Sequence, residues 1–384
     1  MSRLTHIVIL DPIAFAGGSK VSTKHVLSQL ESQEARVTIL TADKETWASS
    51  QAYVAKLHMP KRLETAEQGL GYFARHILIA IQLLWLRLFV GQIHTALGAS
   101  GPGVDLGLYL VKAVLGYRLI QMIHGPVAKS RTIGRCLAAA DSVFYLDATQ
   151  ASLSTALEAA GHSPDIASYP QIQPFKNGLP KQSWPSQCQY DYAVMLWAAS
   201  LLKWKGLDTF TAALSRLSPA ERPESHVCYI RPKQNNLPTS EAPQTLSKVF
   251  WHQAPDNLDE IRASANIFVS TSTKEPFGLS ILEAMAAGMC VIIPSDDAFW
   301  DRQLTANENC LKYQPDDVDS LIEAIQAAEQ NMRQVKRMGK AASNIALQYR
   351  ADLCFAAICE SLVSKSRQVM PELVSKEQQN NTYT

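Results

Sequence analysis

Short apolar runs alternate with helix-length amphipathic segments along nearly the whole chain. Parallel strands covered on both faces have this apolar character, and the segments between the runs are long enough for crossover helices. The pattern therefore predicts an α/β protein built from successive strand–helix units. The predicted strands are 6–10, 36–40, 118–123 and 141–146 in the first half, and 192–197, 226–231, 248–251, 266–271 and 290–294 in the second.

Two predicted helices in the second half carry clear apolar stripes. Leu207, Phe210, Leu214 and Leu217 recur with a helical period of 3.6 residues. A later stripe of the same kind follows two aspartates that suit the positive start of a helix. That stripe consists of Val318, Leu321, Ile322 and Ile325, after Asp316 and Asp317.

A chain of 384 residues exceeds what one core usually organises, so we expect two domains. Residues 171–187 hold three prolines and a glycine and lack helical or strand periodicity, which is typical of a linker. The predicted division is an N-terminal domain over 1–175, a linker over 176–187 and a C-terminal domain over 188–345. A helix over 346–364 is expected to pack back on the N-terminal domain, and a mobile polar tail is expected over 365–384.

The charges and cysteines exclude several classes of protein. Lys and Arg total 36 against 35 for Asp and Glu, so no long-range field attracts nucleic acid, and an anion needs a local site. The seven cysteines are never spaced as C-x-x-C, which argues against a disulfide framework and against zinc. The apolar run 7–10 is too short for a signal peptide. A cytoplasmic location fits these features best.

One apolar stretch, residues 77–90, is interrupted only by Gln82 and Arg87. It is shorter than the roughly 20 residues that span a bilayer. We favour a helix buried between the sheet and its neighbours over a helix on a membrane surface. Trp85, Arg75 and Arg87 keep the second interpretation open.

The segment 270–294 carries the strongest sign of chemistry. Its order is strand, loop, helix and strand, with Pro276 and Gly278 in the loop and the helix starting near Leu279. The free amides of Phe277, Gly278 and Leu279 would point outward at a positive helix end, where a diphosphate could bind.

The helix that follows is apolar except for Ser280 and Glu283, so it is expected to be buried. A buried carboxylate needs hydrogen-bond donors. For Glu283 these donors are either ribose hydroxyls or a cation or amides inside the fold, and the residue alone does not decide between them. Glu275 lies in the loop eight residues earlier, where carboxylates are usually solvated.

Together these residues resemble the signature of retaining B-type glycosyltransferases of family four (glycosyl transferases group one), E-x-F-G-x-x-x-x-E-A-M-A-x-G. The residues in register are Glu275, Phe277, Gly278, Glu283, Ala284, Met285, Ala286 and Gly288. The resemblance implies two Rossmann-like domains with parallel sheets facing across a cleft (GT-B architecture). It also implies that Glu275 holds hydroxyls of the transferred sugar, Glu283 the ribose, and the amides of Phe277 to Leu279 the diphosphate of a nucleotide-sugar donor.

Other segments resemble the same family in the same order. Phe15, Ala16, Gly17, Gly18 and Ser19 are similar to the glycine loop that approaches the donor phosphate. By the same resemblance, His124, after the strand 118–123, is expected to reach the donor sugar. The alternative for His124 is an ordinary strand-end imidazole with its own partners.

One segment departs from the family pattern G-R-L-x-x-x-K-G. Residues 199–206 read ASLLKWKG, which keeps Lys205 but has Ser200 where the arginine is expected. A hydroxyl cannot replace a bidentate guanidinium. Either Lys203 or Arg231 supplies the missing charge, or the donor binds more weakly.

The resemblance implies retaining transfer of a sugar to a glycan or lipid-linked acceptor in the assembly of cell-surface polysaccharide, at the cytoplasmic face of a membrane. The expected catalytic residues are Glu275, His124 and Lys205, with Lys205 and the loop amides stabilising the departing diphosphate. No D-x-D is placed to carry Mg²⁺, so we expect no metal and no cofactor beyond the nucleotide-sugar substrate. Two alternatives remain: an inactive relative that acts as a sugar-nucleotide sensor or partner subunit, and a sugar-nucleotide epimerase.

Overall fold

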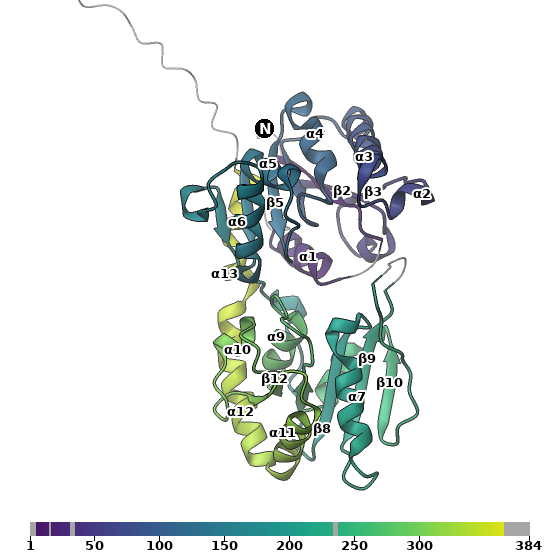
Figure 1. The fold of residues 1–384 in the computed structure, drawn as a ribbon, viewed down its shortest axis with the longest axis vertical. Coiled ribbons are helices and arrows are strands. Elements are labelled where there is room, and N and C mark those ends of the chain that lie inside the picture. The colour runs from purple at the N-terminus through teal and green to yellow at the C-terminus, as the bar shows by residue number, and fades with distance from the viewer. Residues whose placement is uncertain (1–4, 15–16, 31–34, 233–236, 365–384) are drawn as a thin grey trace, which may run out of the picture.

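Two parallel β-sheets divide the chain, as Figure 1 shows in this computed structural model, which describes residues 5–14, 17–30, 35–232 and 237–364. The first sheet has the order β3-β2-β1-β4-β5-β6-β7, and the second has the order β10-β9-β8-β11-β12-β13. All strand pairs in both sheets are parallel. The predicted α/β class with two Rossmann-like sheets is therefore confirmed.

The strands of the first sheet are β1 (Thr5–Asp11), β2 (Ala35–Thr41), β3 (Tyr53–Lys56), β4 (Thr95–Gly98), β5 (Arg118–Ile123), β6 (Ser142–Tyr145) and β7 (Ile172–Pro174). Those of the second are β8 (Val194–Ser200), β9 (Glu224–Ile230), β10 (Val249–Gln253), β11 (Ile267–Val269), β12 (Cys290–Pro294) and β13 (Leu311–Tyr313). In each sheet the strand order reverses beside the first strand of its half, which is where ligands bind in open α/β folds.

Helices cover both sheets. Those of the first half are α1 (Gly18–Leu30), α2 (Lys61–Glu64), α3 (Gly69–Val90), α4 (Leu106–Leu115), α5 (Arg131–Ala139) and α6 (Gln150–Ala159). The others are α7 (Leu207–Arg216), α8 (Leu258–Ser264), α9 (Leu279–Ala286), α10 (Phe299–Gln303), α11 (Val318–Gln330), α12 (Met332–Ala346), α13 (Ala351–Cys354) and α14 (Ala356–Val363). Short 3₁₀ turns lie between them at Glu45–Trp47, Asp147–Thr149, Ile166–Ser168, Lys181–Ser183, Lys203–Lys205 (η5) and Leu347–Tyr349.

The two predicted apolar stripes are confirmed. In α7 and the residue after it, Leu207, Phe210, Leu214 and Leu217 are all buried. In α11, Leu321 and Ile325 are fully buried. The Asp317 carboxylate caps this helix by accepting hydrogen bonds from the amides of Asp319 and Ser320.

The interpretation of residues 171–187 as free of strands is wrong at their start. Ile172–Pro174 forms β7, which pairs with β6 at the edge of the first sheet. Pro174 is the last residue of an edge strand, and a residue in that position does not need an amide for the ladder. A proline therefore does not exclude a strand here.

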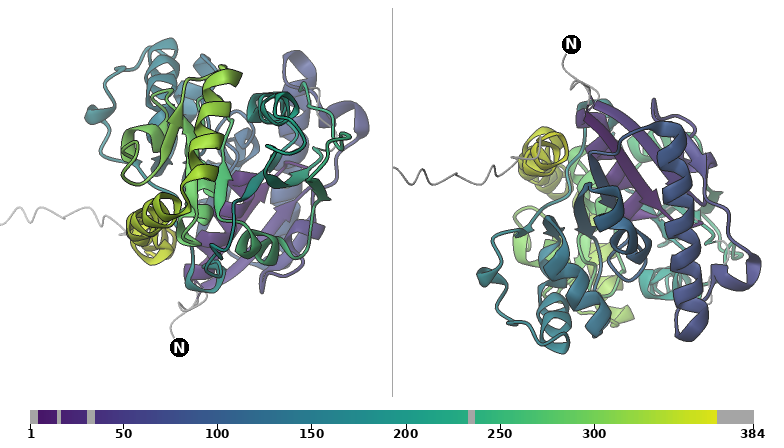
Figure 2. Two further views of the ribbon diagram at one scale, coloured as in Figure 1. Left: turned by 90° about the horizontal axis from the view of Figure 1, so that it is seen from below. Right: turned by 90° about the horizontal axis from the view of Figure 1, so that it is seen from above.

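The chain crosses between its halves twice, at adjacent positions. The amide of Leu179 donates to the Tyr349 carbonyl at 2.9 Å, and the amide of Ala351 donates to the Leu179 carbonyl at 2.9 Å. Beyond this point α13 and α14 pack against α1, and α14 also contacts β1 and β4. Figure 2 shows this C-terminal helical segment beside the first strands. The predicted tail, 365–384, lies outside the described residues.

The helix α3 differs from the favoured interpretation of residues 77–90 as a buried helix. Its inner face is buried through Ile79 and Leu83, but its outer face exposes large apolar side chains, among them Leu88 at 74% and Phe89 at 78% exposure. By length and composition α3 could cross a membrane. In the structure it lies along the first sheet and contacts α4, on the outer side of that half in the right panel of Figure 2.

Candidate functional site

The loop between β11 and α9 is held in an unusual backbone conformation. Gly278 has φ +80° and Lys274 has φ +50°, both in the left-handed region. The Asp296 carboxylate, buried after β12, accepts a hydrogen bond from the Lys274 amide at 2.7 Å. Asp296 therefore fixes this loop. Asp296 was not among the residues predicted for the site.

The start of α9 presents free amides. The Gly278 carbonyl accepts from the amides of Ile281 and Leu282 and from Trp300 Nε1. Within the described part of the chain, the amides of Phe277, Gly278 and Leu279 donate to no other group. Amides of this kind at a helix N-terminus carry partial positive charge, so they are suited to bind an anion.

The side chain of Phe277 has a different role from its amide. The ring is 2% exposed and packs against Phe299, Trp300 and Tyr349, with ring centroids 4.7, 5.3 and 6.0 Å away. Only the backbone of Phe277 is therefore available to a ligand. The aromatic packing instead anchors the loop whose amides are free.

Lys205 and Glu275 meet beside this helix start. Lys205 Nζ lies 2.5 Å from Glu275 Oε2 and 3.9 Å from the centroid of the Trp204 ring. Both charged side chains are mostly buried. A cation and a carboxylate thus lie together next to the free amides of α9.

Gly206 holds the turn η5 against the loop after β11. Its φ is +74°, and a Cβ atom at this position would lie 2.0 Å from the Thr271 carbonyl oxygen. The Thr271 hydroxyl donates to the Lys205 carbonyl at 3.2 Å, and the Thr273 amide donates to the Trp204 carbonyl at 2.9 Å. Only glycine fits this close approach, which sets the position of Lys205 relative to Glu275.

Glu283 pairs with an arginine that sequence reasoning missed. Arg262, buried on α8, places Nη2 2.7 Å from Glu283 Oε2, and its Nη1 lies 3.1 Å from Asp259 Oδ1. Burial raises the pKa of Glu283, and the Arg262 charge opposes that shift. Glu283 Oε1 accepts no hydrogen bond from any described residue. A ribose hydroxyl could still bind there, beside the internal cation that had been the alternative.

Ser200 ends β8, is half-buried and makes no side-chain hydrogen bond with a described residue. The two candidates for the missing arginine are engaged elsewhere. Lys203 Nζ lies 2.6 Å from Asp208 Oδ2, and Arg231 Nη2 donates to the Ala242 carbonyl at 2.8 Å. Neither forms an ion pair with Glu275, so Lys205 is the cation at this carboxylate.

His124 follows β5 in the other half. Its ring lies edge-on to Phe175, with centroids 5.5 Å apart, and both ring nitrogens are buried without a partner among the described residues. Burial lowers the pKa of His124 to about 4, so the imidazole is neutral near pH 7. An ordinary strand-end imidazole has partners of its own, so the ring of His124 differs from that alternative.

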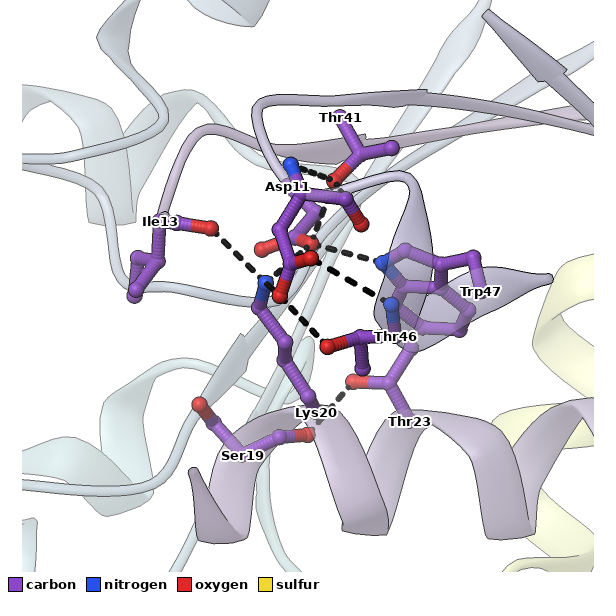
Figure 3. A network of polar contacts seen from close by, with 9 residues as sticks. Asp11, Ile13, Ser19, Lys20, Thr23, Thr41, Thr46 and Trp47 are labelled. Carbon is purple, nitrogen blue, oxygen red and sulfur yellow. Dashed lines mark hydrogen bonds and ion pairs between the residues drawn. The ribbon is translucent and has the colours of Figure 1, made fainter. Parts of the chain in front are cut away.

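Gly17 and Gly18 lie at the start of α1, and a Cβ on Gly18 would meet no atom within 4 Å. Phe15 and Ala16 of the same predicted loop lie outside the described residues. Figure 3 shows the polar network beside the start of α1. Buried Lys20 pairs with Asp11 and Asp43, both at 3.0 Å, and Trp47 Nε1 donates to Asp11 at 2.7 Å. Lys20 thereby fixes α1 relative to the ends of β1 and β2.

The predicted residues thus form two groups. Glu275, Lys205 and the α9 amides lie together in the C-terminal half, whereas His124 follows β5 and Gly17 and Gly18 lie at the start of α1 in the N-terminal half. Figure 1 shows α1 and α9 on the facing sides of the two halves. A small pocket beside Glu275 is lined by Ser272, Asp296 and Trp300. No cluster of three or more His, Cys, Asp or Glu side chains that could hold a metal occurs in the described part of the chain.

Comparison with known proteins identifies the C-terminal half. Residues 180–345 match the family model described as Glycosyl transferases group 1. These residues are a glycosyltransferase domain of that group. The chain is therefore a glycosyltransferase, and its free amides, Lys205, Glu275 and Glu283 all lie inside the matched range. No curated protein sequence matches the chain.

Solved structures show the same fold for nearly the whole glycosyltransferase. The chain is similar to Alr3699/HepE of Anabaena in complex with UDP-glucose, with a TM-score of 0.69, 16% identity and coverage of 93% of this chain and 99% of that one. A glycosyltransferase from Rickettsia africae is similar with a TM-score of 0.67 and 14% identity, over 95% of this chain and 100% of that one. WaaG, a glycosyltransferase involved in lipopolysaccharide biosynthesis, is similar with a TM-score of 0.64 and 12% identity, over 93% of this chain and 100% of that one. The chain thus has the GT-B architecture.

Proposed function

We propose that this glycosyltransferase moves a sugar from a nucleotide-sugar donor to a glycan or lipid-linked acceptor, with retention of configuration, in the assembly of cell-surface polysaccharide. One observation carries the proposal. Three amides at the start of α9, without a partner among the described residues, adjoin the Lys205–Glu275 pair. A diphosphate needs hydrogen-bond donors and a cation, which the α9 amides and Lys205 supply. The hydroxyls of a sugar need a hydrogen-bond acceptor, which Glu275 supplies.

The chemistry assigns a role to each group. The amides and Lys205 would stabilise negative charge as the nucleoside diphosphate departs, which is the largest electrostatic requirement of the transfer. Glu275 would accept hydrogen bonds from hydroxyls of the transferred sugar, and Glu283 would accept one from the ribose. His124, neutral and unpaired, would bind the donor sugar from the other half. Retention then requires attack from the face that the diphosphate leaves, so positioning of both substrates provides much of the catalysis.

The names of the similar structures support particular choices of substrate. The Anabaena protein was solved with UDP-glucose and with UDP and glucose, so UDP-sugars are the first donors to test. Two other similar structures are named as lipopolysaccharide glycosyltransferases, which supports a cell-surface acceptor. We place the reaction at the cytoplasmic face of a membrane, where a lipid-linked acceptor would be presented, and we assign the enzyme no cofactor.

The test combines donor binding with turnover. A panel of nucleotide-sugars is screened by thermal shift, because a ligand that binds only the folded state raises its melting temperature. Donors that stabilise the protein are then assayed for transfer and hydrolysis with and without EDTA. We expect one donor class to give both a shift and turnover that Glu275→Gln removes. Turnover unchanged in Glu275→Gln would refute the assignment.

Ser200 favours one second candidate, an inactive relative that senses a nucleotide-sugar. The guanidinium that the family uses on the diphosphate is replaced by a hydroxyl without a partner among the described residues. A sensor would show the thermal shift without transfer or hydrolysis. The Ser200→Arg variant separates the two cases further, since an active enzyme should bind its donor more tightly with the cation restored.

A further inference from the structure

The outer face of α3 is an apolar stripe that no described residue covers. Its members recur every three or four residues over the whole helix and are exposed by 36% to 90%. They are Leu70, Phe73, Ile77, Ile81, Leu84 and Leu88. This spacing places them on one side of the helix, opposite the buried Ile79, Leu83 and Leu86. The helix is therefore apolar toward the sheet and apolar toward the outside.

The stripe extends sideways into a larger surface, which we call the α3–α4 surface. Trp85 and Phe89 stack beside it, with ring centroids 6.4 Å apart, and both are more than half exposed. On the neighbouring helix α4, Leu110 and Val114 are exposed as well. Apolar patches of this extent on a soluble protein mark an interaction site.

The polar side chains of α3 are turned away from the stripe. Gln82 binds the backbone of His58 through both its oxygen and its nitrogen, each at 2.8 Å. Arg75 and Arg87 are half-buried at the flanks of the helix. The stripe itself thus offers an occupant no hydrogen bond, which is unlike a protein interface, where a substantial part of the area is polar.

The surrounding charge favours an anionic bilayer as the occupant. Residues 51–90 contain five basic side chains and two acidic ones, whereas the whole chain is close to neutral. Lys56, Lys61 and Arg62 are exposed, and α2, which carries Lys61 and Arg62, contacts α3. An apolar helix face with aromatic rings and flanking basic residues is the arrangement that lies in the plane of a membrane interface.

We propose that the α3–α4 surface docks the enzyme on an anionic lipid bilayer, with α3 lying along the interface while its inner face stays on the sheet. The docked helix adjoins the loop after β4, because Tyr72 donates to the Gly103 carbonyl at 2.8 Å. That loop follows the strand next to β5, which ends before His124. On the proposed function, a lipid-linked acceptor would then leave the membrane near the donor site.

The test is flotation of the full chain with vesicles of phosphatidylglycerol and phosphatidylcholine, or of phosphatidylcholine alone. We expect binding to the anionic vesicles that weakens as salt rises. The double substitution Leu84→Glu and Leu88→Glu places two charges on the stripe and should reduce binding at least about tenfold. The matched control is Leu347→Glu with Leu353→Glu, at apolar positions that are 52% and 60% exposed elsewhere, and it should bind as the wild type does.

Further measurements keep the result clear. Thermal melts check the fold of each variant, and the milder Trp85→Ala replaces the double variant if that one unfolds. Light scattering without lipid should give a monomer. Absence of binding to either vesicle, equal binding by the stripe variants, or a dimer that the stripe variants dissociate would overturn the proposal. Transfer to a soluble acceptor is measured in parallel. Vesicle binding without transfer would refute the proposed function but would still support docking on the bilayer.

Discussion

Replacing Arg262 with alanine removes the cation that faces Glu283. Removing one partner of a buried ion pair costs about 3–5 kcal/mol when the remaining charge stays buried. The Glu283 side chain keeps 22% exposure, so water can solvate part of the charge and we expect a loss of about 2–3 kcal/mol. For a domain of this size, that corresponds to a fall of about 5–10 °C in melting temperature at pH 8.

The pH dependence of this loss is the sharper result. Burial already raises the pKa of Glu283, and the loss of Arg262 should raise it further. A carboxyl whose pKa is higher in the folded state binds its proton more tightly when folded. Its stabilising contribution is therefore present below the unfolded pKa of about 4.3 and is lost as pH rises through the folded value. The deficit of Arg262→Ala should be small near pH 4.5 and complete by pH 8.

Calorimetry at pH 4.5, 6 and 8 measures the effect, with two comparison variants. The double variant Arg262→Ala with Glu283→Gln has no carboxyl to titrate at this position and should recover the pH-dependent part of the loss. Arg302→Ala serves as the surface control, because the Arg302 side chain is 43% exposed and its Nη1 lies 4.0 Å from the Asp297 carboxylate oxygen Oδ1. A deficit that is equal at all three pH values, or a double variant no more stable than Arg262→Ala, would show that the Arg262 charge is not what stabilises Glu283.

Three further predictions concern the site directly. Lys205→Ala should lower the rate of transfer by about 10²–10³-fold, because it removes charge stabilisation of the diphosphate, whereas Lys203→Ala should have little effect. Similar losses of transfer in the two variants would contradict the assignment. Gly206→Ala should destabilise the protein by about 2 kcal/mol or more, from the cost of positive φ and the overlap with the Thr271 carbonyl, and an unchanged melting curve would refute this reading. His124, with its pKa lowered to about 4, should contribute no step to the pH profile of kcat between pH 5.5 and 8; a step near 6.5 that His124→Gln abolishes would show a solvated imidazole.

Most strands could be predicted from sequence because their apolar runs are long and buried on both faces. The missed strands lack that signal for local reasons. Tyr53–Lys56 is short and partly exposed at the sheet edge, and Thr95–Gly98 contains alanine and glycine, which favour strands weakly. Leu311–Tyr313 has three residues only. Whether such short segments form strands depends on their packing against neighbouring strands, and a single sequence does not show that packing.

The helix start at Leu279 could be predicted because proline and glycine mark it and acidic residues flank it. Its supporting contacts could not. Arg262 lies among charged residues on a short helix, and nothing in its spacing shows that its guanidinium turns inward to Glu283. The burial of α3 was misjudged for a related reason. An apolar sequence indicates that a helix avoids water, but it does not indicate whether protein or another phase covers each side.

The double crossing at Leu179 and Arg350 determines which pieces of the chain can exist alone. A fragment that ended at residue 175 would lack α14, whose Leu362 carbonyl accepts from the buried Thr95 hydroxyl and whose Ile358 and Leu362 are fully covered. Its sheet would then expose a row of aliphatic groups to water along β1 and β4. The last helices therefore complete a core begun more than 300 residues earlier, and dissecting this enzyme into independent halves requires carrying residues 351–363 over to the first.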